Sequence, residues 1–265
     1  MKVQRAKDVQ LDTVSSLKRE LEGYRQQLSR NYLTDREIMS KLTKEAYDRM
    51  KNDISISHIY VRVAENANPA DTVKAYNKIQ DLYKQLRSGK RFSALAKEAS
   101  EDESTKENGG QIGYITALQL SGFYDLESAA YNTPEGSYSK PVRSRIGYHI
   151  IYVDDIRPAR GRMEVAHILV RVTDKATEEA IAQQKINKLY RDLQDGTAFD
   201  ALAKLASEDD RTAGKGGYIG YITIGQYEGA FEEAAFNIPQ DGAYSRPFRT
   251  SVGWHIVKRI SYPGL

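Results

Sequence analysis

The chain contains one block of sequence twice, and this repeat limits the possible folds more than any other feature. Segment 109–116 (GGQIGYIT) returns at 216–223 (GGYIGYIT), and segment 92–97 (FSALAK) returns at 199–204 (FDALAK). Both pairs are displaced by the same 107 residues (216 − 109 and 199 − 92). A period of this length matches a whole domain. The sequence therefore predicts a duplicated domain and excludes a solenoid of short repeats.

Each copy shows the same order of predicted elements. A β-rich run comes first, at 54–63 and 165–172, and a long helix follows, at 69–87 and 176–193. Then come a short helix, a glycine-terminated loop, a strand through Gly-Tyr-Ile-Thr, a second short helix and two closing strands. This order predicts an α+β fold in which each copy forms a small, largely antiparallel sheet of about four strands surrounded by helices.

The first part of the chain differs from both copies. Apolar residues spaced by three and four predict an amphipathic helix: Val14, Leu17, Leu21, Tyr24 and Leu28. We expect this helix to break at 31–33, and the capping box at 34–37 (TDRE) to begin a second helix that ends near Met50. Two lone helices are marginal in water, so the apolar stripe needs a cover. The rest of this chain is the expected cover; sequence outside it and a bound client are the alternatives.

These patterns set the expected domain boundaries. Residues 1–53 form a helical segment, 54–156 the first copy of the domain, 157–162 a linker and 163–262 the second copy. The start of the chain lacks the apolar region of a signal peptide, and we expect the chain to be a shortened form of a longer protein.

Composition excludes several function classes. The chain has 39 basic and 36 acidic residues, so no large basic field points to a nucleic-acid partner. No apolar run approaches the roughly 18 residues of a membrane span, and we expect no membrane insertion. The chain has no cysteine, which excludes disulfides, thiolate zinc sites and thiol nucleophiles.

An ordered set of short motifs occurs in both copies. It comprises His-Ile, Phe-x-x-Leu-Ala, Ser-x-Asp, Gly-Gly-x-Ile-Gly-Tyr, Ala-Ala-aromatic, Pro-x-x-(Ser/Thr) and Gly-aromatic-His-Ile. The set resembles the parvulin (PpiC-like) family of peptidyl-prolyl cis-trans isomerases, and it covers roughly four-fifths of the chain. A helical segment followed by two such domains resembles the bacterial periplasmic chaperones of the SurA group.

The resemblance implies a function. It implies an isomerase and folding chaperone in the periplasm, without cofactor or metal. Its partners would be unfolded or extended proline-containing polypeptides, with outer-membrane proteins among the candidate clients. The phosphate-directed members of the family carry a basic cluster after the first strand. Only Arg62 and Arg171 stand there in this chain, so phosphate-directed specificity is not expected.

The resemblance also implies the site residues. The catalytic positions of the second copy are His167, Asp209, Thr250 and His255, and their first-copy counterparts are His58, Asp102, Ser144 and His149. The substrate-binding positions are Ile219, Tyr227 and Phe231 in the second copy and Ile112, Leu120 and Leu126 in the first. Phe123 or Tyr124 could replace the aromatic that the first copy lacks. We therefore expect the second copy to be the active one.

The chemistry of proline isomerisation suits these residue types. Amide resonance raises a rotational barrier of about 18–20 kcal/mol, and an enzyme needs only to favour the twisted amide over both planar forms. An apolar pocket can grip the pyrrolidine ring while fixed dipoles surround the rotating carbonyl. One alternative is a chaperone without catalysis that uses both grooves to hold clients. A hydrolase built from histidine, aspartate and serine is disfavoured, because no G-x-S-x-G motif occurs.

Overall fold

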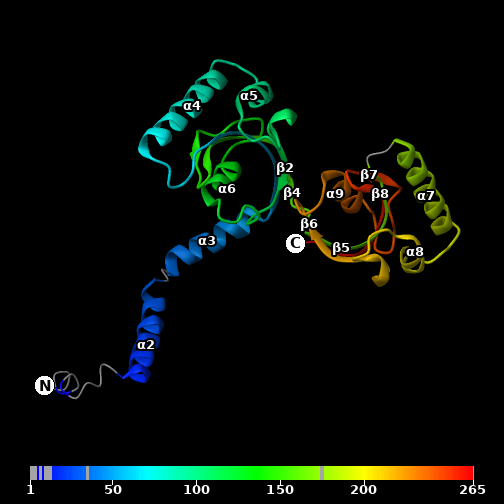
Figure 1. Cartoon of the computed structure of the whole chain (residues 1–265), viewed down its shortest axis with the longest axis horizontal. Helices are drawn as coiled ribbons and strands as arrows, with labels where there is room; N and C mark the ends of the chain where they lie inside the picture. Colours follow the sequence, from blue (N-terminus) through cyan, green and yellow to red (C-terminus); the bar gives the residue numbers. More distant parts are fainter. Residues whose placement is uncertain (1–4, 6–7, 9–13, 34–35, 174–175, 265) are drawn as a thin grey trace. The chain divides into compact units, whose positions relative to one another are not determined.

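The computed structural model describes residues 5, 8, 14–33, 36–173 and 176–264 (Figure 1). The chain forms two compact units, Met1–Asp48 and Arg49–Leu265. The first unit contains α2 (Ser15–Leu33) and nearly all of α3 (Arg36–Arg49). The expected break at 31–33 is wrong, because α2 continues through Leu33. The first two residues of the predicted capping box, Thr34 and Asp35, lie outside the described residues.

The apolar stripe of α2 is exposed. Within this unit Leu21, Tyr24 and Leu28 are 55%, 56% and 64% exposed, and a cover for this stripe stays a prediction. Within the described residues, no helix combines the length and the apolar character needed to cross a bilayer.

The second unit contains both copies, and each copy follows the same sequence of elements. The first copy comprises β1 (Asn52–Arg62), α4 (Pro69–Arg87), α5 (Phe92–Ala99), η2 (Lys106–Asn108), β2 (Gln111–Ile115), α6 (Tyr124–Tyr131), β3 (Val142–Arg143) and β4 (Gly147–Pro158). The second comprises β5 (Arg162–Arg171), α7 (Ala176–Gln194), α8 (Phe199–Ala206), η3 (Ala213–Lys215), β6 (Tyr218–Thr223), α9 (Gly229–Phe236), β7 (Phe248–Thr250) and β8 (Gly253–Gly264).

Each copy builds one four-stranded antiparallel sheet. The strand order is β2-β1-β4-β3 in the first copy and β6-β5-β8-β7 in the second. The first and last long strands of each copy therefore lie side by side at the centre of the sheet. This arrangement confirms the predicted α+β fold. It also places His149 directly opposite Tyr60 and His255 directly opposite Leu169.

Helices cover both faces of each sheet (Figure 1). In the first copy α4 and α5 pack on one face against Ile59, Val61 and Ile150. Helix α6 packs on the other face, against Ile56 and Ile151. Because successive strand residues point to opposite faces, His58 and His149 lie on the same face as Ile56 and Ile151. The histidines therefore lie on the side of the sheet that α6 covers, and the second copy repeats this with α9.

The glycine pair of the repeated motif brings a loop onto the histidine strand. Gly217 has φ = 80°, and a Cβ atom at this position would lie 2.2 Å from the His167 carbonyl oxygen. Gly110 repeats this approach beside His58, with the same 2.2 Å distance. Only glycine tolerates both the left-handed backbone and the close contact. The two glycines thus fix the loop that carries the predicted site aspartates next to the histidines.

The segment between the copies is short and hydrogen-bonded. Pro158 belongs to β4 and Arg162 to β5, so only residues 159–161 lie outside strands. The backbone N–H of Arg160 donates to the buried Asp53 carboxylate at 3.0 Å, and the Arg160 carbonyl accepts from the Tyr262 hydroxyl at 2.6 Å. Residues at the outer ends of both sheets therefore hold this connection.

Candidate functional site

A chain of hydrogen bonds joins the four predicted catalytic residues of the second copy. Thr250 Oγ1 lies 2.7 Å from His255 Nε2, and His255 Nδ1 lies 3.4 Å from His167 Nδ1. His167 Nε2 lies 2.9 Å from Asp209 Oδ2. The two imidazole rings stack with centroids 5.5 Å apart. The structure thus brings all four side chains together, although up to 88 residues separate them in sequence.

The direction of this hydrogen-bond chain follows from its acidic end. An ionised carboxylate only accepts, so His167 carries its proton on Nε2 and its Nδ1 is the acceptor. His255 must then donate from Nδ1, and its Nε2 accepts from the Thr250 hydroxyl. Every donor has an acceptor when both rings are neutral. The network therefore orients its dipoles in one direction, from Thr250 towards Asp209.

The first copy repeats the network. Ser144 Oγ lies 2.8 Å from His149 Nε2, the two Nδ1 atoms of His149 and His58 lie 3.4 Å apart, and His58 Nε2 lies 2.7 Å from Asp102 Oδ2. The hydroxyl of Thr105 donates to the same Asp102 oxygen at 2.6 Å. The two copies therefore share the polar part of the site.

Burial keeps the histidines neutral. It is the largest cause that lowers the pKa of His149 and His255 to about 3, and the neighbouring histidine of each pair lowers it further. Burial also lowers the pKa of His58 and His167, although their aspartate partners oppose the shift. At neutral pH the pairs therefore act as fixed dipoles rather than as proton carriers.

The aspartates stay ionised for a different reason. Partial burial would raise the pKa of Asp209, but hydrogen bonds from Thr212 and His167 outweigh it and hold the pKa below its usual value. Asp102 receives an additional bond from the Ser104 hydroxyl, at 2.6 Å, and its pKa is held well below the usual range. Each network thus ends on a fixed negative charge.

Aromatic rings cover the histidine pair of the second copy. Phe231 of α9 meets His167 and His255 edge-on, with centroids 5.9 Å and 5.5 Å away. Tyr227 stacks on Phe231 at 4.8 Å, and Phe248 of β7 stacks on His255 at 5.4 Å. Ile219 packs against the same cluster. The structure therefore brings the three predicted substrate-binding residues together and adds a fourth, Phe248.

The first copy lacks this aromatic cover. Leu126 stands at the position of Phe231, and Val142 stands at the position of Phe248, since each of β3 and β7 pairs this residue with the second histidine. Leu120 and Phe123 pack near Leu126. Ile112 is 40% exposed, and its grouping with the other two stays a prediction.

Sequence reasoning missed several residues of the sites. Thr105 and Thr212 occupy one position of a repeated Ser-Glu-Asp-x-x-Thr pattern, at 100–105 and 207–212, and comparing the copies could have found them. Phe248 and Tyr60 gave no such signal, because the two copies differ there. Tyr60 is buried and stacks on His149 at 4.9 Å. Besides its partner imidazole, each second histidine thus has one stacked aromatic ring, from β1 in the first copy and from β7 in the second.

A buried ion pair anchors the helix that covers the first site. Arg49 Nη1 lies 3.2 Å from Glu127 Oε1 of α6, and the two side chains are 8% and 5% exposed. Arg49 also donates to the Ser128 hydroxyl at 2.6 Å and lies 5.5 Å from the Tyr131 ring centroid. These contacts position α6, and with it Leu126, relative to the start of β1.

Comparison with protein families decides the identity of the two copies. The family model described as "Rotamase: PPIC-type PPIASE domain" matches residues 58–155 and 167–261. The chain belongs to this family. Both matches begin at the first histidine of a pair, and each covers one complete hydrogen-bond network.

Relatives of this chain include proteins named Chaperone SurA. The chain is 31% identical to Chaperone SurA of Chromohalobacter salexigens over 238 residues, which cover 87% of this chain and 53% of the relative. It is 32% identical to Chaperone SurA of Thiobacillus denitrificans, over 85% of this chain and 52% of the relative. The chain therefore spans about half the length of these relatives. A crystal structure of a PpiC-type isomerase domain matches 41% of this chain and 94% of its own, at 27% identity and a TM-score of 0.37.

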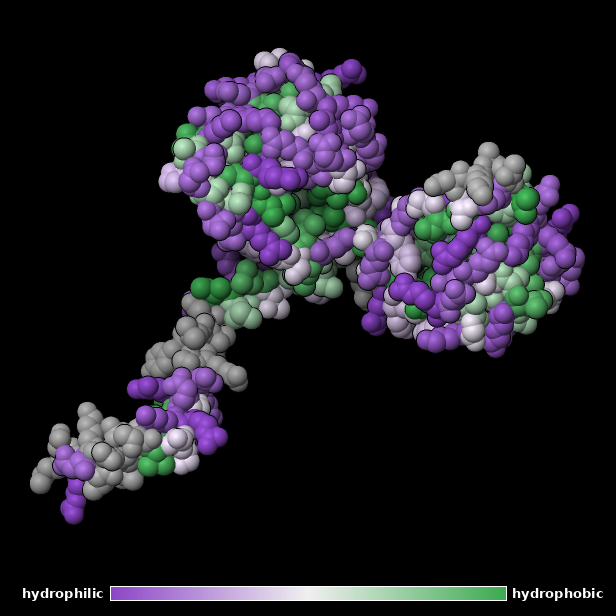
Figure 2. All heavy atoms as spheres, in the orientation of Figure 1, coloured by the Kyte–Doolittle hydropathy of each residue, from purple (hydrophilic) through white to green (hydrophobic). Residues whose placement is uncertain are grey.

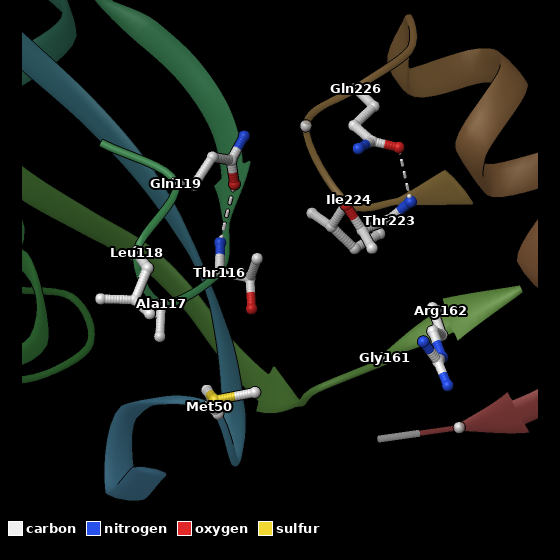
Figure 3. A pocket seen from close by; sticks show the side chains of 12 residues that line it. Met50, Thr116, Ala117, Leu118, Gln119, Gly161, Arg162, Thr223, Ile224 and Gln226 are labelled. Atoms are coloured by element: carbon white, nitrogen blue, oxygen red, sulfur yellow. Dashed lines mark hydrogen bonds between the residues drawn. The ribbon is translucent and has the colours of Figure 1, made fainter. Parts of the chain in front are cut away.

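Residues of both copies line a further pocket. Figure 3 shows that equivalent loops of the two copies contribute to its lining, 116–119 and 223–226. Each loop is closed by a glutamine, because the N–H groups of Thr116 and Thr223 donate to Gln119 and Gln226 at 2.9 Å. None of the predicted catalytic residues lines this pocket. Among the described residues, no cluster of three histidine or acidic side chains is arranged to hold a metal ion.

Proposed function

We propose that the chain is a peptidyl-prolyl isomerase and folding chaperone for unfolded, proline-containing polypeptides. We assign the domains to 54–156 and 163–262, and catalysis to the second. The observation that carries the assignment is the contact of Phe231 with both imidazoles of the His167–His255 pair. An apolar wall and an oriented polar network meet there, which is the combination that rotation of a prolyl amide requires.

Each part of the site has one role in this mechanism. Phe231, Tyr227 and Ile219 hold the pyrrolidine ring, while the peptide carbonyl turns about the C–N bond. Rotation removes amide resonance and changes the dipole around the nitrogen. The oriented network from Thr250 to Asp209 presents a fixed field to this changing dipole, without reorganisation at the moment of reaction. No covalent bond forms or breaks, so the site needs no nucleophile.

A proline-limited refolding assay on the full chain tests the assignment. Phe231→Leu gives the second copy the leucine of the first, and we expect it to lower the isomerisation rate about tenfold. A tenfold lower rate corresponds to the loss of roughly 1.4 kcal/mol of transition-state stabilisation. Leu126→Ala in the first copy is the matched control and should leave the rate unchanged. A rate that falls in the control but not in Phe231→Leu would reverse the assignment.

A second candidate function is holding of clients without catalysis by the first copy. Its site has the full polar network, but Leu126 and Val142 replace the rings that cover the second site. Suppression of client aggregation by the Phe231→Leu variant tests this role. Undiminished suppression in a variant that has lost isomerisation supports holding by the first copy, and a parallel loss of both activities opposes it.

We further propose a periplasmic location, with outer-membrane proteins among the clients. This proposal rests on the similarity to the SurA chaperones. Fractionation of cells that express the complete gene tests the location. Crosslinking in the same cells, followed by identification of the bound polypeptides, tests the clients.

A further inference from the structure

A cleft of about 480 Å³ adjoins the histidine pair of the first copy. Its lining includes Leu126 and also Ser144, which bonds His149. Phe123, Tyr124 and Arg145 also line it; Tyr124 and Arg145 are exposed, and we call this part of the lining the rim. Figure 2 shows hydrophobic side chains gathered on this copy around α6. The cleft therefore extends from the predicted binding position to the surface.

The guanidinium of Arg145 is held in place at this rim. It stacks over the Phe123 ring, 4.7 Å from the centroid, and lies beside the Gly122 backbone. Stacking restricts the side chain while leaving the N–H edge of the guanidinium free to donate, so little entropy is lost when a ligand binds. Among the described residues, no carboxylate is paired with Arg145. The neighbouring Arg143 differs, because it donates to the carbonyls of Val63, Ala64 and Ser144.

The second copy carries the opposite charge at the same place. Helices α6 and α9 begin at Tyr124 and Gly229, so Glu228 stands where the first copy has Phe123. Ser251 stands where the first copy has Arg145, and its backbone N–H donates to the Glu228 carboxylate at 2.7 Å. The first copy thus presents a stacked cation at its rim, and the second presents an anion.

We propose that Arg145 makes the first copy a receptor for client segments that carry an acidic side chain beside the residue held in the cleft. This inference rests on the proposed binding of extended polypeptides and names a chemical preference within it. The guanidinium donates to the client carboxylate, while Leu126 and Phe123 contact the neighbouring apolar side chain. Glu65 and Asp125 also line the cleft and repel a client carboxylate. Of the two arginines in the lining, Arg143 already donates to backbone carbonyls. Arg145 is therefore the position that can donate to the client.

Binding of matched peptides to the full chain tests the proposal. Three sets of fluorescent peptides share one extended, proline-containing sequence and carry Glu, Gln or Lys on either side of the proline. Fluorescence anisotropy gives the Kd of each. We expect the Glu peptides to bind about three- to fivefold more tightly than the Gln peptides at low salt, as for a partly exposed ion pair. We expect this preference to fall as salt rises.

Two variants and one control separate recognition from structure. Arg145→Ser, which takes the residue of the second copy, should abolish the preference for Glu, so that the Glu and Gln peptides bind with the same Kd. Arg145→Glu should transfer the preference to the Lys peptides, which a merely structural role would not produce. Arg91→Gln removes one positive charge from an exposed position outside the cleft and should keep the preference for Glu.

The outcomes distinguish this inference from the proposed function. Equal affinity of the wild-type chain for Glu and Gln peptides would overturn the role of Arg145 while leaving peptide binding intact. Retention of the preference for Glu in Arg145→Ser, or its loss in Arg91→Gln, would also overturn the role of Arg145. Failure of the wild-type chain to bind any of the peptides would contradict the proposed function itself.

Discussion

Acid should destabilise the second copy through its buried histidine pair, and His255 allows the size of the effect to be calculated. Its pKa is about 3 in the folded chain against 6.5 as the ordinary value, and it is 3% exposed. Above pH 6.5 the side chain is neutral in both states and contributes nothing to the pH dependence. Below pH 6.5 the unfolded chain gains a proton that the folded chain does not take up. Stability therefore falls as the pH falls.

The magnitude follows from the two pKa values. At pH 5 the unfolded state gains about 2 kcal/mol from protonation of this histidine, and the folded state gains almost none. His255→Gln cannot take up the proton. We therefore expect the loss of unfolding free energy between pH 7 and pH 5 to be about 2 kcal/mol smaller in this variant. The aspartates of the site do not interfere, because Asp209 is already ionised throughout this range.

The single tryptophan makes the measurement specific to one copy. Trp254 precedes His255 on β8, and its indole N–H donates to Glu179 at 2.7 Å. Urea unfolding followed by its fluorescence at pH 7 and pH 5 therefore reports the second copy. His149→Gln, the same change in the first copy, is the control and should leave the tryptophan-reported pH dependence unaltered. The same pH dependence in wild type and His255→Gln would refute the reasoning.

Three other changes test the surrounding structure. Arg49→Met should lower the unfolding free energy of the first copy by about 3–5 kcal/mol, because the Glu127 carboxylate stays buried without its guanidinium. Calorimetry measures this loss, and the double variant Arg49→Met, Glu127→Met should recover part of it. Gly217→Ala should cost about 4 kcal/mol or more, measured by urea unfolding, whereas Gly242→Ala, also at positive φ but in open space, should cost only about 1 kcal/mol. Thr212→Val removes a donor to Asp209 and should slow isomerisation a few-fold, with Thr212→Ser restoring the rate.

Much of the polar site could be predicted from the sequence because the duplication provides an internal comparison. The histidines, the Ser-x-Asp motifs and the glycine pairs recur at fixed places in both copies, and each has a local physical reason. Gly217, for example, must lack a side chain to approach the His167 strand. The amphipathic periodicity of 69–87 predicted α4 with the bounds that the structure shows. The extent of α2 could not be predicted in this way, because the residues at 31–33 are compatible with either a helix or a break.

The sequence by itself determined the duplicated α+β fold and indicated that each copy contains one pair of histidines. Only the tertiary structure decided which side chains complete each site. Phe248 reaches His255 because β7 pairs with β8 in one particular register, and Tyr60 reaches His149 through the register of β1 with β4. Arg145 lies over Phe123 because a turn and a helix start converge in space. Strand register and loop convergence depend on contacts between distant residues, which the spacing of residues along the chain does not record.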